Sequence, residues 1–224
     1  MKLKLNNFEK LISSNEIFEK ALNKTKEEYR PLDPGQYLYN LLLEKKKNLD
    51  IFSDEYLELV YTTLISWNMN GRGAKLCNIT LFKESLRQNK EDILKLQKYA
   101  IEKLTLEEKE ITLNTLKRLF EKLKLSETNS KLVSFSKTLH FLLPHLVVPI
   151  DRRYTISFFY NSKLIPTDNE PCKSNELQFK IFEELYAKFQ EITKKFDLNP
   201  YLDNKWNANI PKIIDNAIIG FSKI

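Results

Sequence analysis

Carboxylates and lysines are the residues of this sequence that could carry acid–base chemistry. The chain has only two histidines, His140 and His145. Neither has a carboxylate or a cysteine at the spacing that metal ligands need, so both are predicted to be structural or partly exposed. The two cysteines, Cys77 and Cys172, belong to no CxxC motif or Cys/His cluster, which argues against a zinc site and a disulfide scaffold. We therefore expect no metal and no cofactor.

Glycine is scarce, and this scarcity argues against several kinds of active site. The chain has four glycines, far below the roughly 7% of an average protein. It contains no G-x-G-x-x-G, no G-x-x-x-x-G-K-[ST] and no G-x-S-x-G motif. Rossmann cofactor binding, P-loop nucleotide chemistry and a hydrolase nucleophile elbow are all disfavoured. No nucleotide cofactor is expected.

The charge balance permits a polyanionic partner without requiring one. The chain has 36 basic and 30 acidic residues, for a net charge of +6 and a pI near 9.0. The amino-terminal sequence MKLKLNNFEK lacks the apolar core of a signal peptide, and no stretch approaches about 18 uncharged apolar residues. We therefore expect neither secretion nor a membrane partner. A reduced, cytoplasmic setting fits the cysteine usage best.

The segment 130–160 is the most informative part of the chain. A predicted helix over 131–143 ends at Pro144, and residues 148–151 then read Val-Pro-Ile-Asp. This pattern resembles the helix-hairpin-helix DNA glycosylase superfamily, in which a V-P-[VI]-D step leads into a helix. In that family the aspartate, here Asp151, caps the helix and faces the sugar of an extruded nucleotide. In its lyase-type members a catalytic lysine stands about twenty residues earlier. Lys131 has this spacing, whereas Lys137 is nearer and fits less well.

The resemblance implies a chemistry for these residues. A carboxylate at Asp151 would stabilise the positive charge that develops on the sugar when an N-glycosidic bond breaks. Lys131 could instead attack the sugar carbon and form a Schiff base. The base must leave the duplex and stack on a wall, for which Trp67, Met69 and Phe158 are candidates. Each of these residues also has an ordinary structural interpretation, as a helix cap, a solvated lysine or a core side chain.

Several cations are candidates for DNA contacts. The segment 67–75, WNMNGRGAK, combines two close glycines with Arg72 and Lys75, which suits either phosphate contact or a plain turn between helices. Glycosylase hairpins hold a phosphate with glycine-rich turns, but residues 126–130 (SETNS) contain no glycine. Side chains or the start of the helix over 131–143 would have to grip DNA instead. The predicted nucleic-acid-binding residues are Arg72, Lys75, Lys137, Arg152 and Arg153.

A third segment, 206–220 (WNANIPKIIDNAIIG), has mostly core character. Its isoleucines recur at helical spacing and form an apolar stripe, so core packing explains them best. Asp215 and Asn216 flank the stripe, and from there they could reach the cleft of Asp151.

Helical periodicity dominates the chain, so we predict an all-α fold with about nine or ten helices. The capping box Thr105 and Glu108 gives the clearest helix start, and Ser53 precedes another. We expect one domain over 1–224, with two lobes, 52–160 and 1–51 with 161–224, around a cleft as in the glycosylases. The main predicted helices cover 8–22, 37–43, 56–67, 74–86, 91–103, 106–125, 131–143, 154–160, 174–196 and 211–220.

Three functions remain open at this point. The first is a DNA glycosylase-like protein of base-excision repair or defence that binds duplex DNA weakly and in a salt-sensitive manner. The second is a catalytically silent nucleic-acid-binding module. The third is a helical interaction protein whose charge is merely solubilising. The DNA hypotheses gain support if the candidate cations converge around Asp151, and the third gains support if they scatter.

Overall fold

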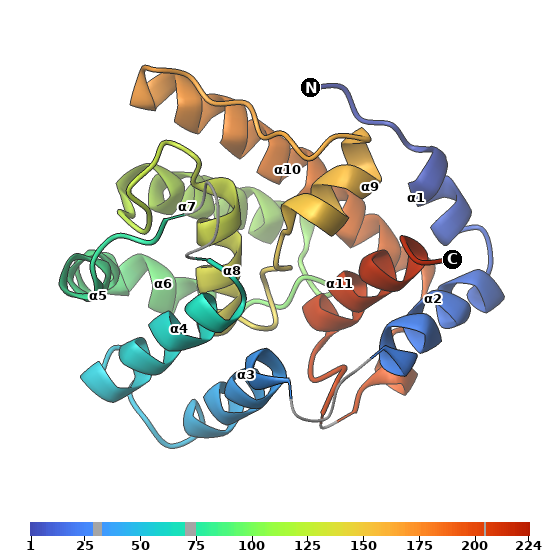
Figure 1. The fold of residues 1–224 in the computed structure, drawn as a ribbon, viewed down its shortest axis with the longest axis horizontal. Helices are drawn as coiled ribbons and strands as arrows, with labels where there is room; N and C mark the ends of the chain where they lie inside the picture. The colour runs from blue at the N-terminus through green and yellow to red at the C-terminus, as the bar shows by residue number, and fades with distance from the viewer. Residues whose placement is uncertain (29–32, 70–74, 204) are drawn as a thin grey trace.

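The structure is a computed structural model that describes residues 1–28, 33–69, 75–203 and 205–224. It confirms the all-α prediction (Figure 1). Over the described residues no strand is found, and the helices include a π-helical turn, η1, and a 3-10 turn, η2. The elements are α1 (Asn6–Leu11), α2 (Asn15–Glu27), α3 (Pro34–Lys45), α4 (Asp54–Ser66), α5 (Ile79–Gln88), α6 (Lys90–Leu96), α7 (Leu106–Lys122), α8 (Leu132–Leu142), η1 (Arg152–Ile156), α9 (Ser157–Tyr160), α10 (Pro171–Lys195), η2 (Asn199–Tyr201) and α11 (Ile210–Phe221).

Helix α8 lies at the centre of the fold. All 11 of its residues are buried, and it packs against α3, α4 and α10. A helix that is covered on every side has no solvated face, which is why this segment is mostly apolar. The buried side chains form one hydrophobic cluster from Phe8 to Ile218. Polar side chains on α8 are therefore surrounded by other elements; Lys137 and His140 find partners there, whereas the hydroxyl of Thr138 makes no hydrogen bond.

Local capping explains where several helices begin. The capping box is present, because the Thr105 hydroxyl accepts from the amide of Glu108 and the Glu108 carboxylate accepts from the amide of Thr105. At α4 the Ser53 hydroxyl accepts from the amide of Tyr56, without the reciprocal bond. The helix expected from residue 74 begins only at Ile79, because the side chain of Asn78 accepts a backbone hydrogen bond and sets the start. The helix expected over 91–103 is shorter, from Lys90 to Leu96.

Helix α11 packs along α2, so distant parts of the sequence lie side by side (Figure 1). The Thr25 hydroxyl donates to the carbonyl of Asn216 over 2.6 Å. Gly220 was expected to close the last helix, but it lies inside α11. A Cβ atom at this position would lie 1.8 Å from the carbonyl oxygen of Ala21. Gly220 is therefore required for the close approach of the two helices rather than for a turn.

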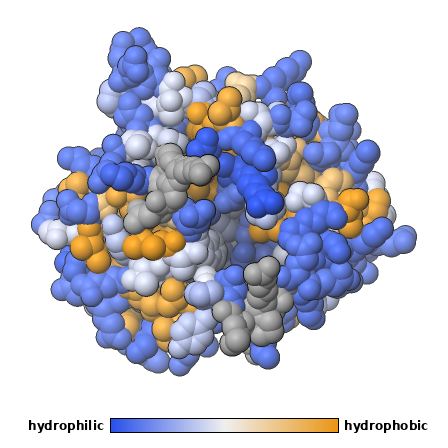
Figure 2. Space-filling model, viewed as in Figure 1, coloured by the Kyte–Doolittle hydropathy of each residue, from blue (hydrophilic) through white to orange (hydrophobic). Residues whose placement is uncertain are grey.

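The surface is mostly hydrophilic. On the face seen in Figure 2, hydrophilic residues predominate, orange patches are scattered between them, and the face is hollowed near its middle. Among the described residues, no helix combines the length and the apolar character that crossing a bilayer requires.

Candidate functional site

A chain reversal at Pro144 controls which residues face one another. After Pro144 the chain is extended and buried over 147–150, as the sequence predicts, and runs back along α8. His140 Nδ1 lies 2.7 Å from the carbonyl oxygen of Val147, and the amide of Ile150 donates to the hydroxyl of Ser136 over 3.0 Å. Residues on the two sides of the turn therefore lie opposite one another.

Lys137 and Asp151 are such a pair. The Lys137 Nζ lies 3.0 Å from Asp151 Oδ2, and the two side chains are 7% and 32% exposed. The other carboxylate oxygen accepts from the amides of Arg153 (2.7 Å) and Tyr154 (3.4 Å), so Asp151 caps η1 as predicted. Burial alone would raise the pKa of Asp151, but Lys137 and the two amides outweigh burial and hold it below its usual value. Asp151 is therefore ionised and still partly accessible.

Asp151 lines a pocket of about 400 Å³. The residues around it come from the ends of α2, α3 and α4, from α8 and η1, and from α11 and the segment before it. These elements meet around the middle of the view in Figure 1. The aromatic side chains in the wall are Trp67, Tyr154 and Trp206. Pockets of this size and mixed lining suit a small organic ligand.

Trp67 is fixed in place at this pocket. Its indole Nε1 donates to the carbonyl of Gly35 over 3.1 Å, and its ring meets Phe141 edge-on at 4.9 Å between ring centroids. Lys137 Nζ lies 5.7 Å from the centre of the Trp67 ring. The sequence analysis named Trp67 as a possible wall for a base, and the residue does line the pocket that contains Asp151.

A second ion pair lies in the same pocket. Lys212 Nζ is 2.7 Å from Asp215 Oδ2, and each side chain is only 6% exposed. The ammonium group also lies 5.2 Å from the centre of the Trp67 ring. Burial raises the pKa of Asp215 although Lys212 opposes the rise, and the charge of Asp151 raises it further. Sequence analysis placed Asp215 near the cleft but missed Lys212, which the lysine–aspartate spacing of i, i+3 within an apolar run could have revealed.

Lys131 lies elsewhere. Its Nζ donates to the carbonyls of Phe120 (3.3 Å) and Glu121 (3.4 Å) near the end of α7. Burial lowers its pKa. It is not among the residues that line the Asp151 pocket. The lysine beside Asp151 is Lys137, the one that the spacing argument ranked second.

The other described candidate DNA contacts are engaged in local interactions. Lys75 pairs with Glu127 at 3.2 Å, both on an exposed surface. Arg152 donates to a backbone carbonyl in the segment after α9 over 3.0 Å. The Arg153 side chain lies over the ring of the next residue, 5.4 Å from its centre. Arg72 lies outside the described residues. Arg152 and Arg153 directly follow Asp151, and the ring under Arg153, that of Tyr154, lines the Asp151 pocket, whereas Lys75 is not among the residues that line it.

Two of the three apolar candidates belong to the core. Met69 is 2% exposed and Phe158 is 4% exposed. Phe158 packs edge-on against Phe159 and Phe221, at 4.8 and 5.5 Å between ring centroids. Neither residue lines the pocket. Their spacing follows the helical apolar pattern, and packing accounts for it.

The two histidines were predicted to be structural or partly exposed; His140 is buried and hydrogen-bonded, and His145 is exposed. His140 is buried and its Nδ1 must carry a hydrogen, because the carbonyl of Val147 can only accept. Its Nε2 therefore accepts from the Tyr39 hydroxyl at 2.8 Å, and the Tyr39 oxygen accepts from the Asn209 amide. Burial lowers the pKa of His140 to about 3 and that of His145 also falls below its usual value. No cluster of metal-ligating side chains occurs in the described part of the chain.

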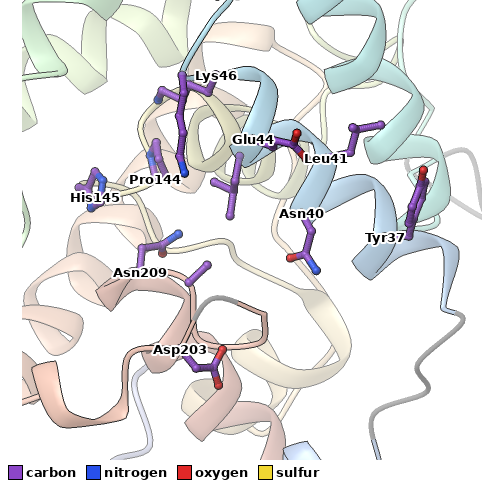
Figure 3. A pocket seen from close by; sticks show the side chains of 12 residues that line it. Tyr37, Asn40, Leu41, Glu44, Lys46, Pro144, His145, Asp203 and Asn209 are labelled. Atoms are coloured by element: carbon purple, nitrogen blue, oxygen red, sulfur yellow. The ribbon is translucent and has the colours of Figure 1, made fainter.

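A larger pocket of about 800 Å³ lies beside α3 (Figure 3). It lies between α3, the turn at Pro144 and His145, and the segment that contains Asp203 and Asn209. The amino group of Lys46 donates to the carbonyl of Leu142 at the end of α8, and burial lowers its pKa to about 8. A lysine bonded to the main chain completes a helix end, so this pocket has a weaker case for chemistry than the one around Asp151.

No protein-family model, no curated protein and no solved structure matches the sequence or the fold. The resemblance to the helix-hairpin-helix DNA glycosylases therefore rests on the residues of this chain alone, chiefly on the Val-Pro-Ile-Asp step.

Proposed function

We propose that the Asp151 pocket binds a nucleobase with its sugar and cleaves the N-glycosidic bond, so that the protein acts as a DNA glycosylase on a base turned out of duplex DNA. One observation carries this proposal: an ionised, one-third exposed carboxylate faces a pocket with a fixed tryptophan in its wall. As the bond breaks, positive charge develops on the sugar, and a fixed negative charge stabilises it. The aromatic wall supplies a surface on which an extruded base can stack.

Lys137 is the candidate nucleophile if the reaction follows the lyase route. The Lys137 ammonium would pass a proton to the departing base; its free amino group would bond to the sugar carbon C1′ as the C1′–N bond breaks and its electron pair goes to the base, and the resulting adduct opens to a Schiff base. The ion pair with Asp151 holds Lys137 at the pocket, 3.0 Å from the carboxylate. In the hydrolytic route water takes the place of the amine, and Lys137 only positions Asp151.

Base release tests the central assignment. The wild type, Asp151→Asn and Lys131→Gln are incubated with duplexes that each carry one modified base, and the freed base is measured. The Asp151→Asn variant keeps an oxygen that can cap η1 but loses the charge, so we expect its rate to fall about 10²-fold or more. Lys131→Gln, a matched change outside the pocket, should keep the wild-type rate. Full activity of Asp151→Asn on a base that the wild type releases would refute the assignment.

Borohydride trapping separates the two routes. The reductant fixes a Schiff base as a covalent protein–DNA adduct. A lyase would give an adduct in the wild type and in Lys131→Gln but none in Lys137→Gln. Base release without an adduct would mean hydrolysis, with Lys137 as a positioning residue.

A helical interaction protein without nucleic-acid function is the second candidate. The partners of Lys75 and Arg152 favour it, because a cation that already pairs with Glu127 or donates to a backbone carbonyl is less available to a phosphate. A titration of duplex DNA at several salt concentrations decides between the candidates. DNA binding should weaken with salt, with a log–log slope of about −0.9 per phosphate contact. No salt-sensitive binding at about 50 mM salt would favour the interaction protein.

A further inference from the structure

The buried Lys212–Asp215 pair has a cost that packing does not explain. Both side chains are 6% exposed, and they form a short contact of 2.7 Å inside the Asp151 pocket. Two charges lose their hydration on burial, and replacing such a pair by apolar residues is often neutral or stabilising. Pro211, Ile213 and Ile214 beside them on α11 are apolar and buried, whereas Asn216 is polar, buried and hydrogen-bonded to the segment before α11. A purely structural α11 would therefore be expected to carry apolar residues at both positions.

The pocket holds two carboxylates in different environments. Asp151 is capped by two amides, paired with Lys137 and partly exposed, whereas Asp215 is buried and faces Lys212. Asp151 and Lys137 are near enough to Asp215 to influence its pKa, which is raised while that of Asp151 is lowered. In enzyme sites with two carboxyl groups, the group with the lowered pKa stabilises positive charge, and the group with the raised pKa can donate a proton.

We propose that the Lys212–Asp215 pair supplies the proton that an uncharged nucleobase takes up as it leaves, which makes uncharged bases the substrate class of this pocket. This inference rests on the proposed glycosidic cleavage. The Lys212 ammonium is the proton source in this proposal, because it is hydrogen-bonded to Asp215 and lies beside the ring of Trp67, where a stacked base would be within its reach.

The proton balance of the hydrolytic step is complete with these residues. The C1′–N bond breaks and its electron pair goes to the base nitrogen, while the proton of the Lys212–Asp215 pair passes to the base. The oxygen of a water molecule bonds to C1′, and its proton passes to Asp151. Solvent then returns this proton from Asp151 to the pair. The products are a neutral free base and an abasic sugar.

The charge of the leaving base provides the test. An uncharged base such as hypoxanthine, uracil or 8-oxoguanine would leave as an anion unless it is protonated, so it needs the donor. A base that already carries a positive charge, such as 7-methylguanine, leaves as a neutral molecule without a donor. Loss of a proton donor should therefore affect the first group only, whereas damage to the pocket should affect both.

The experiment compares base release by the wild type and by the double variant Lys212→Met with Asp215→Leu, which leaves no buried charge unpaired. We expect the double variant to lose about 10²-fold or more on the uncharged base that the wild type releases fastest, and less than about threefold on 7-methylguanine where the wild type releases it. Urea unfolding checks that the fold is intact. The matched control is Lys188→Met with Glu191→Leu, an i, i+3 pair on α10 outside the pocket.

Each outcome separates this inference from the proposed function. Three results would overturn the proton-donor role while glycosidic cleavage stands. The wild type releases 7-methylguanine alone, the double variant keeps the wild-type rate on the uncharged base, or the folded double variant loses equally on both kinds of base. Release of no base by the wild type would overturn the proposed function and this inference together.

Discussion

Acid is expected to destabilise this protein through His140, because the surrounding hydrogen bonds require a neutral ring. Nδ1 donates to Val147 and Nε2 accepts from Tyr39, so a second proton would meet a hydroxyl hydrogen instead of an acceptor. The ring is fully buried, and its pKa is about 3 rather than the usual 6.5. The replacement that tests this effect is His140→Gln, which keeps an amide for hydrogen bonding and has no titratable group.

The size of the effect follows from the pKa values. Between pH 6.5 and about 3, the unfolded chain binds a proton at His140 that the folded chain does not bind. The free energy of unfolding is unaffected above this window and falls with each pH unit below 6.5, by about 1.4 kcal/mol. By pH 4.5 the loss relative to a pH well above 6.5, where the ring is neutral in both states, is therefore about 2.7 kcal/mol, a large share of the 5–15 kcal/mol typical of a domain.

Urea unfolding at a series of pH values from 7 to 4.5 provides the measurement. The variant should be less stable than the wild type at pH 7, by about 1–3 kcal/mol, because glutamine satisfies the buried partners imperfectly. The wild type should then lose about 2.7 kcal/mol more than the variant on the way to pH 4.5. His145 and the carboxylates are present in both proteins, so their contributions cancel in the difference. Parallel pH dependences for the two proteins would refute the reasoning.

Three further substitutions have defined effects on the free energy of unfolding in urea. Gly220→Ala should cost about 2 kcal/mol or more and lower the melting temperature, since its Cβ would meet the Ala21 carbonyl at 1.8 Å; an unchanged stability would contradict the close packing of α2 and α11. Lys46→Met should stabilise the fold by up to about 3 kcal/mol below pH 8, because the buried ammonium of the wild type is charged there. This gain should disappear as the pH rises towards 10.5. A gain that is independent of pH would contradict the lowered pKa of about 8 for Lys46. Thr105→Ala should cost about 1 kcal/mol through loss of the capping box, and a neutral result would mean that packing alone fixes the start of α7.

Much of the fold could be predicted because helix ends have local signals. Thr105 with Glu108 and the stop at Pro144 act through neighbouring atoms of the chain, and both are observed where the sequence predicts them. Asn78 is an equally local signal, and recognising it as a cap would have moved the start of α5 from residue 74 to 79. The role of Gly220 was not predictable in this way, because it depends on Ala21, a residue at the other end of the chain.

The candidate site was predicted in part for a similar reason. The local pattern around Asp151 identifies it as a cap, and the structure agrees. Its lysine partner depends on where the chain reverses: with the turn at Pro144, the position opposite Asp151 is Lys137, and Lys131 is left beside the end of α7. Spacing taken from a family could not show this, because the length of the link between α8 and η1 sets the register. Lys212 comes from a helix distant in sequence, which only the tertiary fold brings to the pocket.

The packing of α2 against α11 also affects the order in which this part of the chain can fold during synthesis. α2 leaves the ribosome before α11, but the surface that covers it, including the acceptor of the Thr25 hydroxyl, belongs to α11. Contacts between such distant segments form late, because bringing them together closes a long loop and lowers the entropy of the chain before the contacts stabilise it. Until α11 emerges, the apolar face of α2 stays uncovered and the pocket lacks its second ion pair. A nascent chain therefore carries Asp151 and Lys137 for some time before it can hold them in a finished pocket.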